Sequence, residues 1–147
     1  MSKNSSAEIL ASYSSDDMER LVETWTAGFP GTDASELHEF VPKIVHAERS
    51  EIIIARNLVG QLASAMVVNI DLGRDKLRGR IDDVATHPDS LRKGFGGIIL
   101  DFSIDWFGKH GVSRVYLASS DEREPAHALY KSRGFYIHET NDFQLDL

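Results

Sequence analysis

A cluster of three glycines near the middle of the chain limits the fold more than any other feature of this sequence. Gly94, Gly96 and Gly97 come after a β-branched stretch that stops at Pro88, and a long helical pattern starts within the cluster. The apolar residues of that pattern recur at helical spacing and are Phe95, Ile98, Ile99, Phe102 and Trp106. The pattern predicts a helix over about 94–109. The chain must therefore pass from a strand through a tight loop directly into a helix.

The loop between that strand and that helix has the properties of an anion-binding site. Glycine lets backbone N–H groups approach a ligand closely, and the N-terminus of a helix contributes partial positive charge. Arg92 and Lys93 add two full positive charges, so the segment suits a pyrophosphate. The order of residues fits neither a Walker loop, in which the lysine follows the glycine, nor a Rossmann fingerprint in the first turn of a βαβ unit. The alternative is that the glycines serve only a tight turn.

The N-terminal part of the chain is predicted to be helical. Ser15 precedes two acidic residues and an apolar stripe, which predicts a helix over 16–27 with Ser15 as its cap. A second helical stretch starts near residues 32–36, and Pro42 within it predicts a kink or two shorter helices. We expect the polar residues 1–7 to form a frayed leader.

The remaining segments predict strands with one short helix. The expected strands are 52–55 and 62–70, which form an antiparallel hairpin, then 80–86, 115–118 and 143–147. A short helix over 125–133 is expected to end with Gly134 as its cap. No repeat or internal linker interrupts these segments, so we expect a single α+β domain over residues 1–147.

The charge balance and the amino-acid usage exclude several classes of function. The 147 residues include 16 Lys and Arg against 23 Asp and Glu, which gives a net charge of −7. Because a nucleic-acid surface needs dense positive charge, we expect no nucleic-acid partner. The chain contains no cysteine, which excludes disulfides, thiolate metal sites and a cysteine nucleophile, and we expect a cytoplasmic location.

Membrane and metal binding are not expected either. No apolar run approaches the ~18 residues of a membrane span, and the N-terminus lacks the apolar core of a secretion signal. The six histidines show neither His-x-His nor His-Glu-x-x-His spacing, so we expect no metal site.

Two segments together resemble the GNAT superfamily of acetyl-coenzyme A-dependent N-acetyltransferases. Residues 81–97 are similar to its strand, proline and glycine-loop signature, and residues 126–135 look like its A-x-x-L-Y-x-x-x-G-F helix. The resemblance implies a GNAT-like α/β sandwich with a mixed, mostly antiparallel central sheet of about six to seven strands flanked by helices. It implies acetyl-CoA as the cosubstrate and no metal.

The resemblance also assigns the residues that bind the cosubstrate. It implies that the pantetheine arm lies along the backbone of Val84, Ala85 and Thr86. It places the pyrophosphate against main-chain N–H groups of the segment Leu91, Arg92, Lys93, Gly94, Phe95, Gly96 and Gly97. The sequence departs from the family at Leu91, where Arg or Gln is usual, so we expect weaker help from side chains there. Arg123 is a second departure, since many members have Asn at that position.

Tyr130 and Asp82 occupy positions that the resemblance assigns to catalysis. Tyr130 falls on the family's general-acid tyrosine, which reprotonates the departing thiolate. Asp82 aligns with a glutamate that serves as base, and its shorter side chain favours a relay through water. The alternatives are that Tyr130 only packs in its helix and that Asp82 and Asp83 pair with neighbouring arginines. Strand alternation would send Asp82 and Asp83 to opposite faces.

The leading hypothesis is an N-acetyltransferase in which a primary amine attacks the acetyl thioester directly within a ternary complex. The alternative from another class is a non-catalytic acyl-CoA-binding or sensing module of the same fold, and a weaker one is a phosphate-ligand domain unrelated to CoA. The acidic charge favours a cationic acceptor, either a small molecule such as a polyamine or aminoglycoside-like amine, or a lysine-bearing peptide. Dimers are common in that family, so a homodimer is an open alternative to a monomer.

Overall fold

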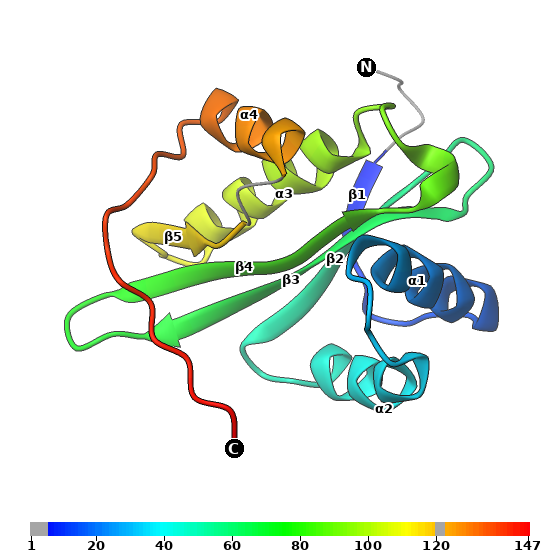
Figure 1. The fold of residues 1–147 in the computed structure, drawn as a ribbon, viewed down its shortest axis with the longest axis horizontal. Coiled ribbons are helices and arrows are strands. Elements are labelled where there is room, and N and C mark those ends of the chain that lie inside the picture. Colours follow the sequence, from blue (N-terminus) through cyan, green and yellow to red (C-terminus); the bar gives the residue numbers. More distant parts are fainter. Residues whose placement is uncertain (1–5, 120–122) are drawn as a thin grey trace.

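The structure, a computed structural model, describes residues 6–119 and 123–147 and has a five-stranded sheet (Figure 1). Across the sheet the strands follow the order of the chain: β1 (Ser6–Ile9), β2 (Ser50–Arg56), β3 (Leu62–Leu72), β4 (Leu77–Thr86) and β5 (Arg114–Leu117). The first four pair antiparallel, and β4 pairs parallel with β5. The expected α+β fold is confirmed, with five strands among the described residues rather than six to seven.

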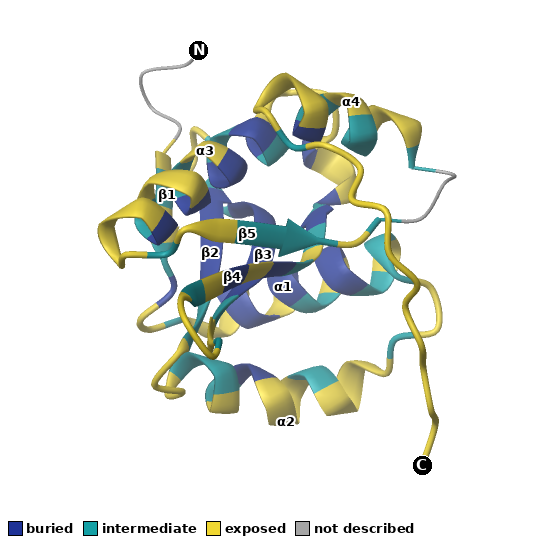
Figure 2. Cartoon of the chain, turned by 90° about the vertical axis from the view of Figure 1, so that its left-hand side faces the viewer, coloured by how far each residue is buried: buried dark blue, intermediate teal, exposed yellow. Residues whose placement is uncertain are grey.

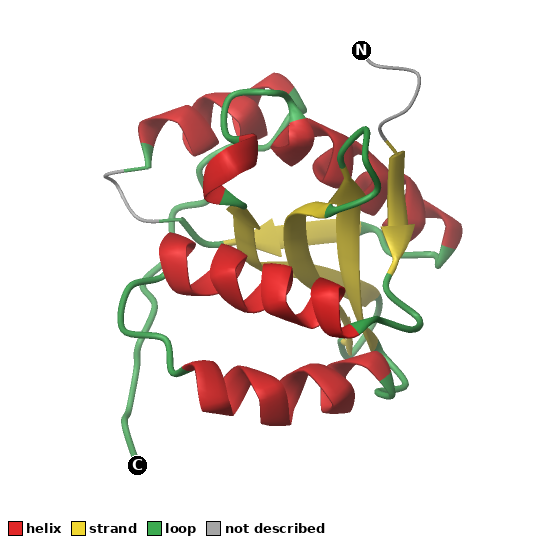
Figure 3. Cartoon of the chain, turned by 90° about the vertical axis from the view of Figure 1, so that its right-hand side faces the viewer, coloured by secondary structure: helices red, strands yellow, loops and turns green. Residues whose placement is uncertain are grey.

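Two helices cover each face of this sheet (Figures 1 and 3). The first pair is α1 (Ser15–Gly28) and α2 (Ala34–Val45), and the second is α3 (Phe95–Lys109) and α4 (Glu124–Ser132). A short 3₁₀ helix, η1 (Pro88–Ser90), connects β4 to the glycine loop ahead of α3. The glycine loop therefore stands at one end of the sheet, between β4 and the second pair of helices.

Strand alternation divides the buried apolar residues into two cores. In β2, Ile52 and Ile54 belong to the core under α1 and α2, whereas Ile53 and Ala55 belong to the core under α3 and α4. All four are 0% exposed, and Figure 2 shows β2 in the dark blue of buried residues. Both faces of the central strands are covered by helices. For this reason the sequences of β2 and β3 are nearly continuous apolar runs.

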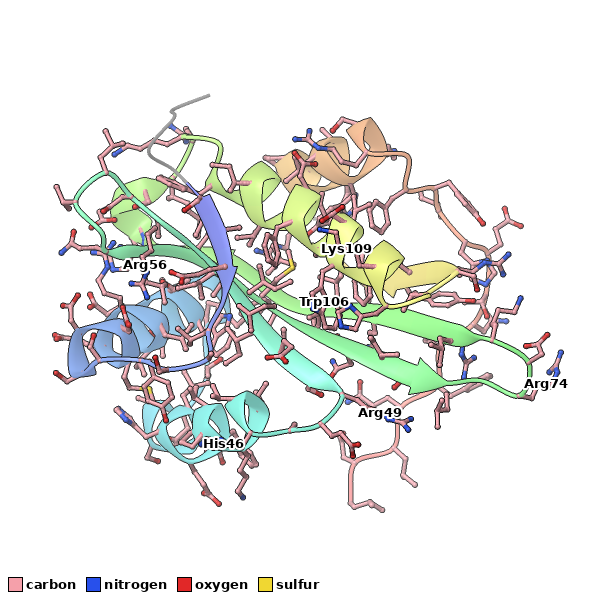
Figure 4. The ribbon with its side chains drawn as sticks, turned by 180° about the vertical axis from the view of Figure 1, so that it is seen from behind. His46, Arg49, Arg56, Arg74, Trp106 and Lys109 are labelled. Carbon is pink, nitrogen blue, oxygen red and sulfur yellow. The ribbon has the colours of Figure 1, made fainter. Side chains whose placement is uncertain are left out.

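Arg56 at the end of β2 connects the sheet edge to α1. Its guanidinium donates to the carboxylates of Glu8 in β1 and Asp17 in α1, and Figure 4 shows Arg56 beside both elements. The charge of Arg56 lowers the pKa of Asp17. These pairs fix the start of α1 against the edge of the sheet.

Two details of the first helices differ from the sequence-based expectations. The cap of α1 is Ser14 rather than Ser15, because Ser14 and Asp17 form a reciprocal capping box: the Ser14 hydroxyl accepts from the Asp17 N–H at 3.0 Å, and the Asp17 carboxylate accepts from the Ser14 N–H at 3.2 Å. Pro42 lies within α2, which is one helix and not two. Proline there removes one backbone donor near the end of the helix, where the other turns still hold it together.

The two ends of the chain also differ from expectation. Ser6 and Ala7, expected in a frayed leader over residues 1–7, pair with Arg56 and Ala55 in β1. Residues 1–5 of that leader lie outside the described residues. The expected strand over 143–147 is wrong, because no regular structure follows α4. Its alternating apolar residues lie in solvent without a partner strand, and alternation alone cannot hold a strand.

Candidate active site

Strands β4 and β5 separate from each other and leave a cavity at the fork. Their parallel pairing joins residues 78–81 to residues 114–117, after which β5 ends and β4 continues to Thr86. A cavity of about 130 Å³ lies at this fork, with walls from β4, β5, α4, the residues next to β5 and α4, and Phe29 just after α1. Its lining includes Asp82 and Val84 of β4 and Tyr130 of α4, which the sequence predicted to share one site.

A β-bulge in β4 forms the floor of this fork. Ala65 pairs with Ala85 and Val67 with Asp82, so the single residue Met66 lies opposite both Asp83 and Val84. Asp83 has a φ of 58°, a left-handed conformation that is uncommon for any residue other than glycine. The extra residue interrupts the ladder where β5 departs, and this leaves backbone groups of β4 facing the fork.

The bulge also changes where the two aspartates lie. Asp82 stays on the face of Val67, where Arg80 Nε donates to both of its oxygens at 3.1 Å and Asn69 Nδ2 donates at 3.4 Å. Asp83 lines the cavity as well, within a run of four consecutive lining residues, 81–84, so the expectation that at most one of the two carboxylates points into it stays a prediction. Strict alternation, on which that expectation depended, fails at the bulge.

The environment of Asp83 changes its acidity. Although Asp83 as a residue is exposed, partial burial of its carboxyl raises the pKa of that group, the negative charge of Asp82 raises it further, and Arg80 acts in the opposite direction. No hydrogen bond to the Asp83 carboxyl occurs among the described residues. A carboxylate with a raised pKa takes up a proton more readily, which is the property of a general base.

Tyr130 is the most deeply buried side chain of α4. It is 7% exposed, and burial raises the pKa of its hydroxyl above the ordinary value near 10, an effect that Arg123 partly opposes. Tyr130 therefore keeps its proton at neutral pH and can act as a donor into the cavity. Its ring lies 6.1 Å from that of Phe135, so packing fixes its position.

Arg123 and Ser119 also line the cavity at the fork. Arg123 Nη2 donates to the Val84 carbonyl at 3.4 Å, and its guanidinium lies 5.1 Å from the centre of the Phe29 ring. The Ser119 hydroxyl is buried and has no hydrogen-bond partner among the described residues. Arg123 therefore places a positive group at a carbonyl of β4, and Ser119 adds a hydroxyl to the residues that line the cavity.

The N-terminus of α3 has the geometry expected of an anion cradle. Gly94 caps the helix with a φ of 86°, and a Cβ placed there would meet no atom within 4 Å. No side chain caps the first turn, so the N–H groups of Phe95, Gly96 and Gly97 lack partners within the helix. Arg92 also has a positive φ, of 61°, and the loop is exposed.

The other two glycines have a packing role that the sequence did not predict. A Cβ at Gly97 would lie 2.9 Å from the Arg133 guanidinium, and one at Gly96 would lie 3.4 Å from Leu129. Both contacts are with α4 or its end. Gly96 and Gly97 thus let α4 approach α3 closely, whereas Gly94 supplies the left-handed turn.

A network of ion pairs holds the segment ahead of this loop. Arg20 of α1 donates to Asp89 in η1 and to the Leu62 carbonyl. His87 is 6% exposed, and its imidazole contacts Glu23 and Asp89. The contact with Arg20 holds the pKa of Asp89 well below its ordinary range. These side chains fix η1 against α1 and β3.

The remaining predicted cosubstrate residues lie between the fork and the glycine loop. Ala85 is 5% exposed, and its Cβ is close enough to α1 that a Cβ at Gly28 would approach it to 2.8 Å. Thr86 pairs with Ser64, and Leu91 is 55% exposed. None of the three lines the cavity at the fork, so a role for Ala85 and Thr86 would fall to their backbone.

A second cavity adjoins the first between α1, α2 and the sheet. It has a volume of about 330 Å³ and shares Phe29 and Asp83 with the cavity at the fork. The sequence reasoning missed Asp83 and Phe29 as site residues, because neither the bulge nor the meeting of α1 with β4 leaves a periodic pattern. The positive φ of Asp83, and the fact that Asp83 and Phe29 line both cavities, become visible only in the three-dimensional structure.

The described residues give no indication of a metal or a membrane span. Within residues 6–119 and 123–147, no group of three or more His, Asp or Glu side chains could hold a metal ion. No helix in the same residues is long and apolar enough to cross a membrane.

Comparison with known proteins identifies a family model and one curated relative. Residues 16–135 match the model described as the acetyltransferase (GNAT) family. The uncharacterized N-acetyltransferase YhdJ of Bacillus subtilis (strain 168) is 38% identical over 58 residues, which cover 39% of this chain and 41% of the relative. That alignment spans less than half of the relative's length.

Solved structures share the fold over almost the whole chain. A transcriptional regulator from Bacillus halodurans C-125 has a TM-score of 0.81 at 19% identity and covers 96% of this chain and 99% of its own. Glucosamine-6-phosphate N-acetyltransferase from Arabidopsis thaliana has a TM-score of 0.74 at 19% identity, with 95% and 98% covered. At these identities the similarity concerns the fold.

Proposed function

We propose that this chain, which belongs to the GNAT acetyltransferase family, transfers an acetyl group from acetyl-CoA to a primary amine. The observation that carries the proposal is the fork between β4 and β5, where Tyr130, Asp82 and Asp83 line one cavity. The uncapped N-terminus of α3 supplies an anion site at the end of the same strand. A thioester donor with a pyrophosphate needs both features.

The glycine loop fits the pyrophosphate of the donor. The first-turn N–H groups of α3 are without helical partners, and Gly94 leaves open space in front of them. Arg92 and Lys93 add charge at the rim. Leu91 supplies no charge, so main-chain groups carry most of the contact. The β4 backbone at Val84–Thr86 borders the path from this loop to the fork.

The chemical step is direct aminolysis of the thioester that acetyl-CoA supplies. The acceptor arrives as an ammonium ion and loses one proton to a carboxylate. A C–N bond then forms as the C–S bond breaks, and the leaving thiolate takes the proton of the Tyr130 hydroxyl. The amide nitrogen then releases its extra proton to solvent, and solvent returns a proton to the Tyr130 oxygen. The balance is one amide, one free thiol and one proton released.

The base is one member of the Asp82–Asp83 pair, and the structure favours Asp83. Arg80 and Asn69 occupy the oxygens of Asp82. The pKa of Asp83 is raised, which makes it a stronger proton acceptor than an ordinary aspartate. Asp82, the candidate from the sequence, then raises the basicity of its neighbour through its charge.

Calorimetric titration of acetyl-CoA into the protein tests donor binding. Gly94→Glu places a carboxylate in front of the α3 N-terminus, and Gly94→Ala is the matched control because both carry the same left-handed strain. We expect the glutamate variant to lose binding and the alanine variant to retain most of it. Equal affinity in both variants would place the pyrophosphate elsewhere.

A thiol-release assay with Tyr130→Phe then tests catalysis. We expect unchanged acetyl-CoA affinity and a turnover number lower by about 10²-fold or more, the size expected for losing a general acid. An acetyl-CoA complex that acetylates no amine, with wild-type Tyr130 in place, would instead identify the non-catalytic sensing module.

A further inference from the structure

We infer that the acceptor is a primary amine attached to an apolar aryl or alkyl body, and that the groove between α1, α2 and the sheet holds this body. The inference rests on the proposed acetyl transfer and narrows its acceptor. The groove has a volume of about 330 Å³, within the ~300–1,000 Å³ range of small-molecule pockets. It meets the cavity at the fork through Phe29 and Asp83.

The walls of the groove are almost entirely apolar. Its described lining residues are Trp25, Phe29, Thr32, Leu37, Phe40, Val41, Ile44, Val67 and Asp83. Three of these are aromatic and four are aliphatic. Asp83 is the one ionisable residue among them, and Thr32 supplies the one hydroxyl. An apolar body would therefore replace water along most of the surface of the groove.

Apart from the Asp83 carboxyl, the polar side-chain atoms of the groove are already engaged. Thr32 Oγ1 donates to the Phe29 carbonyl at 2.7 Å, and Trp25 Nε1 donates to the Asp83 carbonyl at 2.7 Å. A body with many hydroxyls or a second ammonium group would give up hydrogen bonds to water without finding new partners here. This argues against aminosugars and polyamines as acceptors, although the net charge of the chain is acidic.

The groove is firm at its base and open at its rim. Trp25 and Val41 are 4% and 1% exposed, so the base is fixed by packing in the core. Phe40 at the rim is 48% exposed, which is unusual for a phenylalanine on a helix that packs against a sheet. An aryl or alkyl body in the groove would cover part of this ring.

The charge at the junction of the two cavities fixes the orientation of the acceptor. Asp83 attracts an ammonium group and then accepts its proton, while the apolar body lies toward α2. The neutralised amine thus faces the fork, where Tyr130 and the β4 bulge lie. A molecule held in the reverse direction would bury its ammonium among apolar side chains without a partner.

Tryptophan fluorescence gives a readout that does not depend on turnover. The chain contains two tryptophans: Trp25 lines the groove, and Trp106 packs with the other core on α3. In a Trp106→Phe background, Trp25 is the one remaining tryptophan, and its emission follows binding in the groove. We expect 2-phenylethylamine to change its emission saturably, and 2-phenylethanol, which has the same body without the charge, to bind about tenfold more weakly. Asp83→Asn should remove this difference.

Acetylation rates test the same preference. With acetyl-CoA saturating, we expect kcat/KM for 2-phenylethylamine to exceed the values for spermidine and glucosamine at least tenfold. Leu37→Glu places a carboxylate in the groove and should shift the preference toward 1,6-diaminohexane. Leu58→Glu is the matched control, since Leu58 is 66% exposed in the β2–β3 turn and should leave both rates unchanged. Phe40→Ala, at an exposed position, gives a milder loss for the aryl amine if Leu37→Glu does not fold.

The outcomes separate this inference from the proposed function. Faster acetylation of spermidine or glucosamine would overturn the apolar acceptor and leave acetyl transfer intact. A saturable Trp25 response to 2-phenylethylamine without acetylation of any amine would support the ligand class of the groove and overturn the proposed reaction. No Trp25 response, or an equal response in Leu37→Glu and Leu58→Glu, would overturn the inference.

Discussion

Arg20 in α1 and Asp89 in η1 form a two-pronged ion pair that connects the first helix to the entrance of the glycine loop. Arg20 Nη1 and Nη2 donate to the two carboxylate oxygens of Asp89 at 2.7 and 3.1 Å. The Arg20 side chain is 8% exposed and that of Asp89 is 51% exposed. The arginine is thus a buried cation whose partner stands at the surface, immediately ahead of the loop proposed to bind pyrophosphate.

Asp89→Asn should destabilise the fold near neutral pH. It leaves Arg20 buried without an anionic partner, and after allowing for the exposure of Asp89 we expect a loss of about 1–2 kcal/mol in the free energy of unfolding. Because the folded pKa of Asp89 lies below its unfolded value, its contribution is present above about pH 4 and is lost as the pH falls through the folded pKa. Denaturant melts of both proteins at pH 7 and at low pH measure this. A gap that stays constant at low pH would contradict it.

The pH dependence of kcat/KM should identify the base. Asp83 must be deprotonated to accept a proton, and its pKa is raised, so activity should rise with pH through a value above the ordinary range of aspartate near 4. Asp83→Asn should abolish this rise of kcat/KM with pH, together with most of the rate. Asp82→Asn should move the rise to lower pH, because it removes a neighbouring negative charge. The opposite result would assign the base to Asp82. Pre-steady-state thiol release in the presence of amine gives the profile.

Gly79 in β4 should tolerate no side chain. A Cβ there would lie 2.6 Å from the ring of Phe107, which is 1% exposed. Gly79→Ala should therefore lower the free energy of unfolding by about 1–3 kcal/mol through overpacking. Gly108→Ala is the control: it lies in α3, its Cβ would meet nothing within 4 Å, and it should stabilise the helix by about 0.5–1 kcal/mol. Thermal melts that show equal shifts for both would contradict this packing argument.

Side chains of the glycine loop should contribute little to donor affinity compared with the backbone. Arg92→Ala and Lys93→Ala each remove one exposed charge, so we expect only a few-fold loss of acetyl-CoA affinity and a weaker dependence on salt. Titrations at two ionic strengths measure both effects. A loss as large as that of Gly94→Glu would show that charge, and not the α3 N–H groups, holds the pyrophosphate.

Much of the fold can be predicted from the sequence where a pattern is long and locally determined. The helix expected at 94–109 is found at 95–109, and the hairpin of β2 and β3 lies where apolar runs flank a turn. Local patterns fail where the pairing with a neighbouring strand determines whether a segment forms a strand. β1 is four residues long and is held by β2, while residues 143–147 alternate correctly but have no neighbouring strand.

The candidate site is less accessible to prediction than the fold. Tyr130, Asp82 and Val84 were expected there from the family resemblance, and all three line the cavity at the fork. Asp82 and Asp83 were expected on opposite faces, because period-two alternation was assumed to continue through β4. The bulge arises from the pairing of β4 with β3, and no residue type in the sequence of β4 indicates it.

The bulge at Asp83 has a consequence for how the chain can vary. Ile81 belongs to the core under α3 and Ala85 to the core under α1, although residues four apart in a regular strand share a face. The single surplus residue acts as a phase shift that lets one strand serve both cores. Deleting it would restore regular alternation, and the side chains of either the start or the end of β4 would then move to the opposite face of the sheet. Folding itself therefore preserves the residue that opens the fork, whatever acceptor the protein uses.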